Sequence, residues 1–154
     1  MSNSGFVFLG ILGAIFAVIG VIIAIVLYIF FALSLSKLAK KRGMEMPWLA
    51  WVPVAQFYLI GLMVKSVKVS TFEIPKLEIV FPVAFLVYLI LGAIPVLGFL
   101  IFIAYYALMI IILYNLYNQY TPEKAKLYAG LSILGITVPF LINKISDMEP
   151  VNLP

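Results

Sequence analysis

Residues 6–33 read FVFLGILGAIFAVIGVIIAIVLYIFFAL, a run of 28 residues with no charged side chain. The charge-free stretch is in fact longer, because no charged residue occurs between Gly5 and Lys37. Uninterrupted apolar stretches of about 18 residues or more are typical of transmembrane helices. The residues before the run supply no positive charge, unlike the start of a cleavable signal peptide, so we expect a retained first membrane-spanning helix.

The rest of the chain has the same character. Hydrophobic residues make up 66% of the 154 residues, charged residues make up 10%, and the mean hydropathy is +1.22. Two further apolar regions, Val80–Tyr114 and Leu127–Leu141, are too uniform for the core of a soluble protein. The expected fold class is all-α: a polytopic transmembrane helix bundle forming one domain over residues 1–145, followed by a short polar tail at 146–154.

A turn is predicted in the middle of the second apolar region. As one helix, Leu77–Tyr117 would be about 61 Å long, twice the hydrocarbon thickness of a bilayer. The segment Gly92–Gly98 places two glycines around a proline, which is a strong turn signal. We therefore expect two helices, at about 77–94 and 97–117, that form a hairpin.

The last helix is expected to begin at Thr121–Glu123. Thr is a good N-cap, Pro fits the first helical position, and Glu in the first turn suits the helix dipole. From there one helix is expected to run to about Asn143. Residues 146–154 carry two prolines and are expected to form a loose tail.

The segment Pro47–Val64, PWLAWVPVAQFYLIGLMV, allows more than one structure. Its 18 uncharged residues are long enough for a membrane span. However, Pro53 lies in its interior, Gln56 is polar, and Trp48 and Trp51 are residues that favour the membrane interface. It could be a span, a re-entrant hairpin or an interfacial helix.

Charge distribution separates these possibilities. If Pro47–Val64 crosses, the bundle has five spans and the ten basic residues divide evenly between the two sides. If it enters and leaves on the same side, the bundle has four spans, both termini are outside, and only Lys144 lies apart from the other basic residues. The positive-inside rule favours four spans plus one re-entrant or interfacial segment, with five spans as the alternative. The densest basic cluster is expected to be a cytoplasmic anchor: Lys37, Lys40, Lys41 and Arg42.

Small residues recur along the first helix at steps of three and four, which keeps them on one helix face. This predicted packing face consists of Gly10, Gly13, Ala17, Gly20 and Ala24. In lipid, small residues allow helix backbones to approach closely. The face can serve packing between this protein's own helices, or docking to another membrane protein or a second copy.

Few residues suggest chemistry. The sequence has no Cys and no His, and its carboxylates are dispersed in loops and the tail. We therefore expect no catalytic, cofactor-binding or metal-binding residues and no enzymatic activity. No charged residue lies deep in a predicted helix, which argues against a proton-coupled pump. The best candidate for a polar cavity is Gln56 beside Pro53, because a broken segment can expose backbone carbonyls, although Gln56 can also simply bond a neighbouring backbone group.

The net charge of +4 is also explained by a membrane. Lys and Arg retain loops in the cytoplasm and attract anionic lipid headgroups, so the expected partner of this charge is the bilayer surface and not nucleic acid.

The run Lys37–Val64, KLAKKRGMEMPWLAWVPVAQFYLIGLMV, resembles a segment of small multi-pass membrane proteins of Gram-positive bacteria. In them a basic stretch is followed by a PWLAW-type and then a YLIG-type sequence. The resemblance implies a bacterial cytoplasmic membrane, and it supplies no catalytic or binding residues.

Two functions are compatible with this sequence. The first is a non-enzymatic membrane protein that acts through helix–helix interaction, as an accessory, immunity-type or modulatory partner of another membrane protein. The alternative is a small oligomeric channel or transporter, with a pathway lined near Pro53 and Gln56.

Overall fold

The computed structural model describes residues 3–69 and 71–154. Within these residues the chain is 74% helix and 4% strand, so the expectation of a mostly helical protein is confirmed. The elements in chain order are α1 (Asn3–Lys41), η1 (Pro47–Trp51, a 3₁₀ turn), α2 (Pro53–Val64), β1 (Val67–Val69), β2 (Phe72–Ile74), α3 (Leu77–Leu91), α4 (Pro95–Asn118), α5 (Ala125–Ser132) and α6 (Val138–Ser146).

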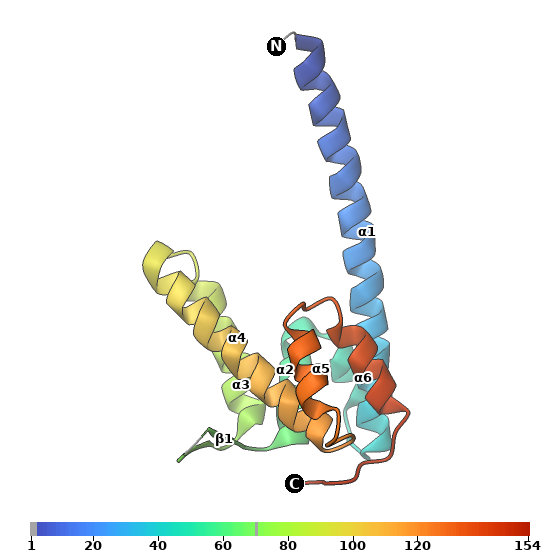
Figure 1. The fold of residues 1–154 in the computed structure, drawn as a ribbon, viewed down its shortest axis with the longest axis vertical. Helices are drawn as coiled ribbons and strands as arrows, with labels where there is room; N and C mark the ends of the chain where they lie inside the picture. Colours follow the sequence, from blue (N-terminus) through green and yellow to red (C-terminus); the bar gives the residue numbers. More distant parts are fainter. Residues whose placement is uncertain (1–2, 70) are drawn as a thin grey trace.

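Helix α1 has two parts with different surroundings. Its N-terminal part projects away from the rest of the molecule, and only its C-terminal end packs against other elements (Figure 1). In that end Ala32, Leu35, Leu38 and Ala39 are fully buried, at the three- and four-residue spacing of one helix face. The buried face contacts α6 on one side and η1 on the other.

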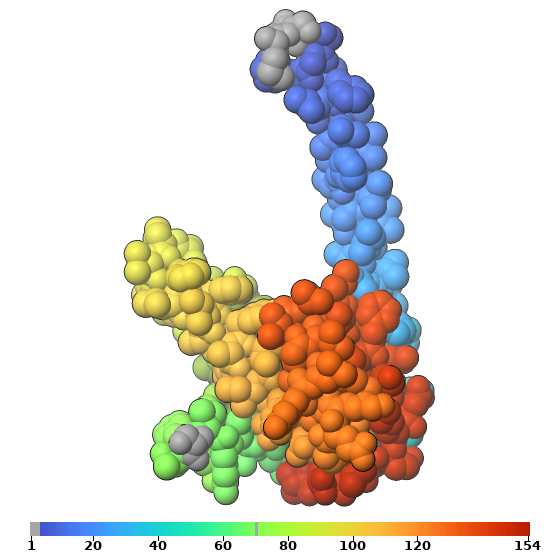
Figure 2. Space-filling model, in the orientation of Figure 1, coloured from blue at the N-terminus to red at the C-terminus, as the bar shows by residue number. Residues whose placement is uncertain are grey.

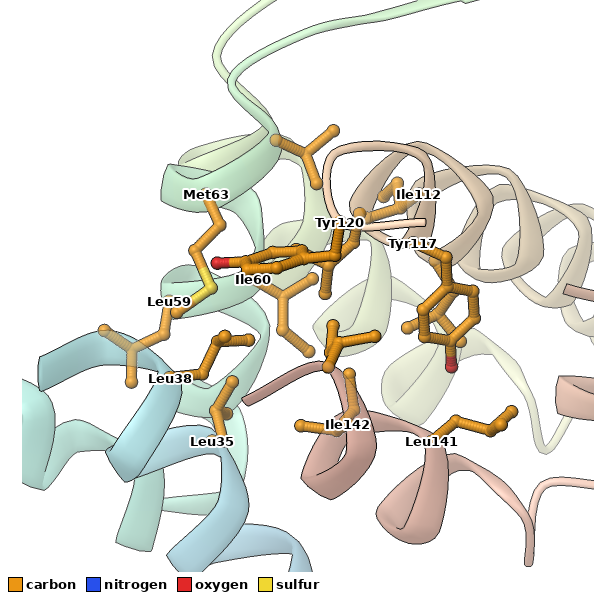
Figure 3. Close-up of a cluster of buried hydrophobic side chains, with 14 of the residues drawn as sticks. Leu35, Leu38, Leu59, Ile60, Met63, Ile112, Tyr117, Tyr120, Leu141 and Ile142 are labelled. Carbon is orange, nitrogen blue, oxygen red and sulfur yellow. The ribbon is translucent and has the colours of Figure 1, made fainter. Parts of the chain in front are cut away.

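The core lies where the C-terminal end of α1 meets α2, α4 and α6 (Figure 3). Leu35 and Leu38 of α1 face Leu59 and Met63 of α2, and Ile142 of α6 lies beside them. The C-terminal part of α4 closes the cluster with large side chains that are almost fully buried: Ile112, Leu113, Leu116 and Tyr117.

The ambiguous segment is divided at Pro53, which is the first residue of α2 and not an interior residue of a longer helix. Helix α2 has 12 residues and is about 18 Å long, much less than the hydrocarbon thickness of about 30 Å. The segment therefore consists of a short 3₁₀ turn, η1, followed by the short helix α2, and these two elements pack against each other. The Tyr28 hydroxyl donates a hydrogen bond to the Trp51 carbonyl and attaches this turn to α1.

The predicted hairpin is confirmed, with α3 and α4 joined across Gly92–Ile94. Its tip is tight, because a Cβ at Gly98 would overlap the backbone of Gly92. Among the described residues, two helices are long and apolar enough to cross a membrane: α1, over Ser4–Lys41, and α4. Helix α3 has 15 residues, and α4 returns alongside it.

The expectation of one last helix from Thr121 to about Asn143 is wrong. The chain forms α5, of eight residues, and α6, of nine, and neither is long enough to cross a bilayer. Gly135 lies between them with φ of +66°, a conformation that glycine adopts without steric cost. The two short helices pack against different partners, α5 against α4 and α6 against α1.

The end of α1, the α2–α3 and α4–α5 connections and the tail lie at one end of the molecule, where the C-terminus also lies (Figure 1). Lys37 forms an ion pair with Asp147, and Lys41 Nζ lies 3.1 Å from Glu149 Oε1. Lys65 Nζ donates to the Pro154 carbonyl oxygen at 3.0 Å. The expectation that Lys144 and the tail lie opposite the other basic residues is therefore corrected, because α5 and α6 form a turn that brings the chain back to the same end.

Gly61→Ala is expected to lower the free energy of unfolding by about 1–3 kcal/mol. Helix α2 packs so closely on the start of α3 that a Cβ at Gly61 would overlap the backbone of Leu77. The measurement is chemical unfolding in detergent, followed by tryptophan fluorescence. Gly13→Ala is the matched control, since nothing lies within 4 Å of a Cβ there. Equal stability of the two variants would contradict the close α2–α3 contact.

Candidate functional site

The predicted packing face on α1 lies entirely outside the folded body. No residue in the most apolar 18-residue window of α1 is buried (Figure 2). A Cβ added at Gly10, Gly13 or Gly20 would meet no other atom within 4 Å. The face therefore makes no close contact within this chain.

The spacing of this face suits a second helix. Gly13 with Ala17, and Gly20 with Ala24, each form a small-xxx-small pair, which permits close approach of two transmembrane helices. The alternation of three- and four-residue steps averages 3.5 residues, the period of left-handed helix pairs. Bulky side chains occupy the rest of this surface, for example Phe16, which is 65% exposed.

A second group of small residues packs within the chain and provides a contrast. Ala125, Ala129 and Ser132 of α5 are buried. The Ser132 hydroxyl donates to the Tyr128 carbonyl and lies 2.9 Å from the Tyr117 hydroxyl of α4. Small residues on α5 thus serve internal packing, whereas those on α1 have no internal partner.

Gln56 and Pro53 do not face a common open space. The Gln56 side chain is 6% exposed, and its amide donates to the Ala50 carbonyl at 2.7 Å. This bond closes the turn between η1 and α2. Pro53 is exposed at the start of α2. The arrangement gives the channel alternative no specific support.

The four residues of the basic cluster have different environments. Lys37 and Lys41 pair with the acidic residues of the tail, as described above. Lys40 is exposed and forms no ion pair within the described residues. Arg42 is half-buried and turns inward toward α2 and α4.

Arg42 connects three segments of the chain. Its Nε donates to the Tyr120 hydroxyl at 2.7 Å, one terminal nitrogen donates to the Met63 carbonyl at 2.9 Å, and the other donates to the Gln119 side chain. Its guanidinium carbon also lies 5.1 Å from the centre of the Tyr120 ring. The connection thus joins the C-terminal ends of α1, α2 and α4.

Gln119 continues this network into the tail. Its amide donates to the Met63 carbonyl at 3.1 Å, and its backbone carbonyl accepts from the amides of Val151 and Asn152. The residue is 6% exposed. Sequence reasoning missed Gln119, because a polar residue after an apolar helix is typical of any membrane interface and gives no sign of burial.

The ion pair between Lys37 and Asp147 alters the acidity of the tail. The hydrogen bond and positive charge of Lys37 hold the pKa of Asp147 below its usual value, with a smaller contribution from the charge of Lys41. Because both side chains are exposed, the pair positions the tail and contributes little to stability.

The described residues contain no group of three His, Cys, Asp or Glu side chains that could hold a metal ion. Comparison of the chain with protein-family models, with curated proteins and with solved structures finds no match. Two features of the structure therefore bear on function. One is the free surface of α1, and the other is the end of the molecule that carries Lys37, Lys40, Lys41, Arg42 and Lys65, which we call the basic end.

The contact between the tail and α1 is expected to depend on pH. Since the pKa of Asp147 is lowered in the folded protein, the contribution of the ion pair is complete above about pH 4 and is lost as the pH falls through the folded value. Fluorescence anisotropy of a probe on Val151→Cys should be constant from pH 8 to 5 and fall below pH 4. Asp147→Asn should remove this transition, and Glu123→Gln should not. An unchanged transition in Asp147→Asn would contradict the assignment.

Proposed function

We propose that this protein is a non-enzymatic integral membrane protein that docks the free part of α1 against a transmembrane helix of another membrane protein. In this role it is an accessory, immunity-type or modulatory subunit of the bacterial cytoplasmic membrane. The observation that carries the proposal is the unpacked small-residue face of α1, Gly10, Gly13, Ala17, Gly20 and Ala24.

The glycines support an external partner on energetic grounds. In a helix interior each glycine costs about 1 kcal/mol relative to alanine, and internal packing at Gly10, Gly13 and Gly20 does not require one. In a bilayer the apolar surface alone does not drive association, because lipid tails are as apolar as the helix. Close backbone contact with a second helix would explain why glycine occupies these positions.

The rest of the structure anchors the C-terminal end of this helix. The last turns of α1 are fixed by η1, α6 and the Arg42 network, so the free part leaves the body in a defined direction. We assign the second helix to a different protein, because the described residues hold no group of side chains that could bind a metal ion and docking is the role that the free helix suits. A pair of identical chains is the outcome that the experiment below distinguishes.

The proposed topology places the basic end in the cytoplasm. In place of the four spans expected from the sequence, we propose three crossings: α1 crosses once and the α3–α4 hairpin crosses twice, while η1–α2 and α5–α6 enter and leave on the basic side. Helix α3 is only about 22 Å long, so its crossing requires local thinning of the bilayer beside α4. All ten Lys and Arg residues lie in loops or helix ends on that side. The positive-inside rule favours this over the four-span arrangement, in which Lys144 lies on the other side from the remaining nine. The bilayer, with its anionic headgroups, is then the partner of this charge and nucleic acid is not.

Single-cysteine labelling tests the topology, and the absence of native cysteine gives a clean background. In intact cells, Thr71→Cys and Val151→Cys should be protected from a membrane-impermeant thiol reagent, and Ala93→Cys at the hairpin tip should be labelled. Permeabilised cells provide the control, in which all three should react. Labelling of Val151→Cys in intact cells would place the tail outside and contradict this topology.

Site-specific photocrosslinking tests the docking. A crosslinker at position 17 of α1 should capture a distinct membrane protein in native membranes. Gly13→Leu with Gly20→Leu should lower the yield about tenfold, the effect of losing roughly 1.4 kcal/mol of helix contact. Ile22→Phe adds bulk to the opposite face and is the matched control.

The three possible results separate the alternatives. Loss of the product in the double leucine variant and its retention in Ile22→Phe would support docking. A product with twice the mass of the chain, together with a dimer in detergent, would indicate self-association instead. A strictly monomeric protein that captures nothing would count against the proposal.

A further inference from the structure

A pocket of about 350 Å³ lies at the basic end, between the end of α1, the end of α2 and the tail. Its polar wall is formed by Lys41, Arg42, Lys65 and Glu149, and its apolar wall includes Leu62 and Leu153. The end of α2 and the tail, which line the pocket, lie at the opposite end of the molecule from the N-terminal part of α1 (Figure 1), so the pocket plays no part in the docking proposed above.

The charges around the pocket are unbalanced. Three cationic side chains line it and one carboxylate, Glu149, faces them. Glu149 pairs with Lys41 at 3.1 Å. In the part of the chain that the structure describes, the hydrogen-bond partners of Arg42 are all neutral: the Tyr120 hydroxyl, the Met63 carbonyl and the Gln119 amide. A half-buried guanidinium without a counter-ion favours binding of an anion.

The guanidinium of Arg42 and the backbone of Lys65 are also held in place before any ligand arrives. Three of the five N–H groups of Arg42 are used by the network, which fixes the plane of the guanidinium and leaves two donors. Lys65 has a φ of +65°, unusual for a residue with a side chain. Its backbone is held there because its N–H donates to the Gly61 carbonyl at 2.7 Å and its carbonyl accepts from the Leu77 N–H at 3.0 Å.

We propose that this pocket binds a phosphate group, carried by a soluble organic phosphate or by an anionic lipid headgroup. The two free N–H groups of Arg42 suit the planar, two-point contact that guanidinium makes with phosphate oxygens. Lys65 supplies a second charge, after exchanging its contact with the Pro154 carbonyl for the ligand. The apolar wall contacts the carbon skeleton of the ligand.

Binding is measured by thermal unfolding of the full chain in a zwitterionic detergent, followed by tryptophan fluorescence. Inorganic phosphate and glycerol 3-phosphate are titrated against chloride at matched ionic strength. A ligand that binds only the folded state raises the unfolding midpoint, and the shift grows with the logarithm of the ligand concentration above the dissociation constant. The lipid source is tested in nanodiscs of phosphatidylglycerol, compared with nanodiscs of phosphatidylcholine.

Lys65→Gln is the decisive variant, because Lys65 is exposed and outside the Arg42 network. It should weaken phosphate binding about tenfold, the usual effect of losing one charge-assisted hydrogen bond. Lys124→Gln removes a charge at the same end without lining the pocket and should bind within about twofold of the wild type. Arg42→Lys should abolish binding, and its own unfolding curve shows whether it folds.

The outcomes identify the source or overturn the proposal. Protection by the soluble phosphates that depends on Lys65 indicates a soluble ligand. Protection only by phosphatidylglycerol, with the same dependence on Lys65, indicates a lipid headgroup. No protection in either arm overturns the proposal. Equal weakening by Lys65→Gln and Lys124→Gln also overturns it, since that would indicate general attraction to a basic surface.

Discussion

The guanidinium of Arg42 bonds Met63 at the end of α2 and also Gln119 and Tyr120, the two residues that follow α4, and the way the helix ends meet depends on these bonds. The helices of this protein are separate apolar segments for which lipid is nearly as good a neighbour as another helix. Directional bonds at their ends therefore determine how they meet. Gln119 extends the same network to the tail, so four distant parts of the chain become one end of the molecule.

That end explains how one chain can contain both a compact body and an unpacked helix. C-terminal to Phe31, α1 packs against η1 and α6, and its buried residues recur on one face. N-terminal to Tyr28 the same helix packs against no other described element. Its exposed surface there includes glycines that internal packing does not require. A rigid base and a free helix are the two parts that a docking subunit needs. They are also separate from the pocket proposed to bind phosphate, which lies at the basic end.

Much of the fold was predictable from local patterns. The glycine–proline turn predicted the α3–α4 hairpin to within three residues, because the turn depends only on neighbouring backbone geometry. The division at Pro53 was foreseen as a break, although not as a helix start. The last helix was not predicted correctly. Its apolar length satisfied the requirement for a span, and only the packing of α5 on α4 and of α6 on α1 favours a turn at Gly135 over a continuous helix. That turn brings the tail and Lys144 back to the basic end. For this reason the proposed topology has all ten basic residues on one side, whereas the sequence-based topology had Lys144 on the other.

The sequence by itself determined the mostly helical fold, the long apolar first helix, the hairpin and the basic cluster, because hydrophobic length and charge placement act locally and additively. It also marked the small-residue face of α1 without saying what that face contacts. Tertiary structure alone decided that this face is unpacked, that Gln56 bonds Ala50 and that Arg42 turns inward. Those outcomes depend on residues 21 to 78 positions apart in the case of Arg42, and no local pattern encodes which distant carbonyl or hydroxyl a polar side chain will reach.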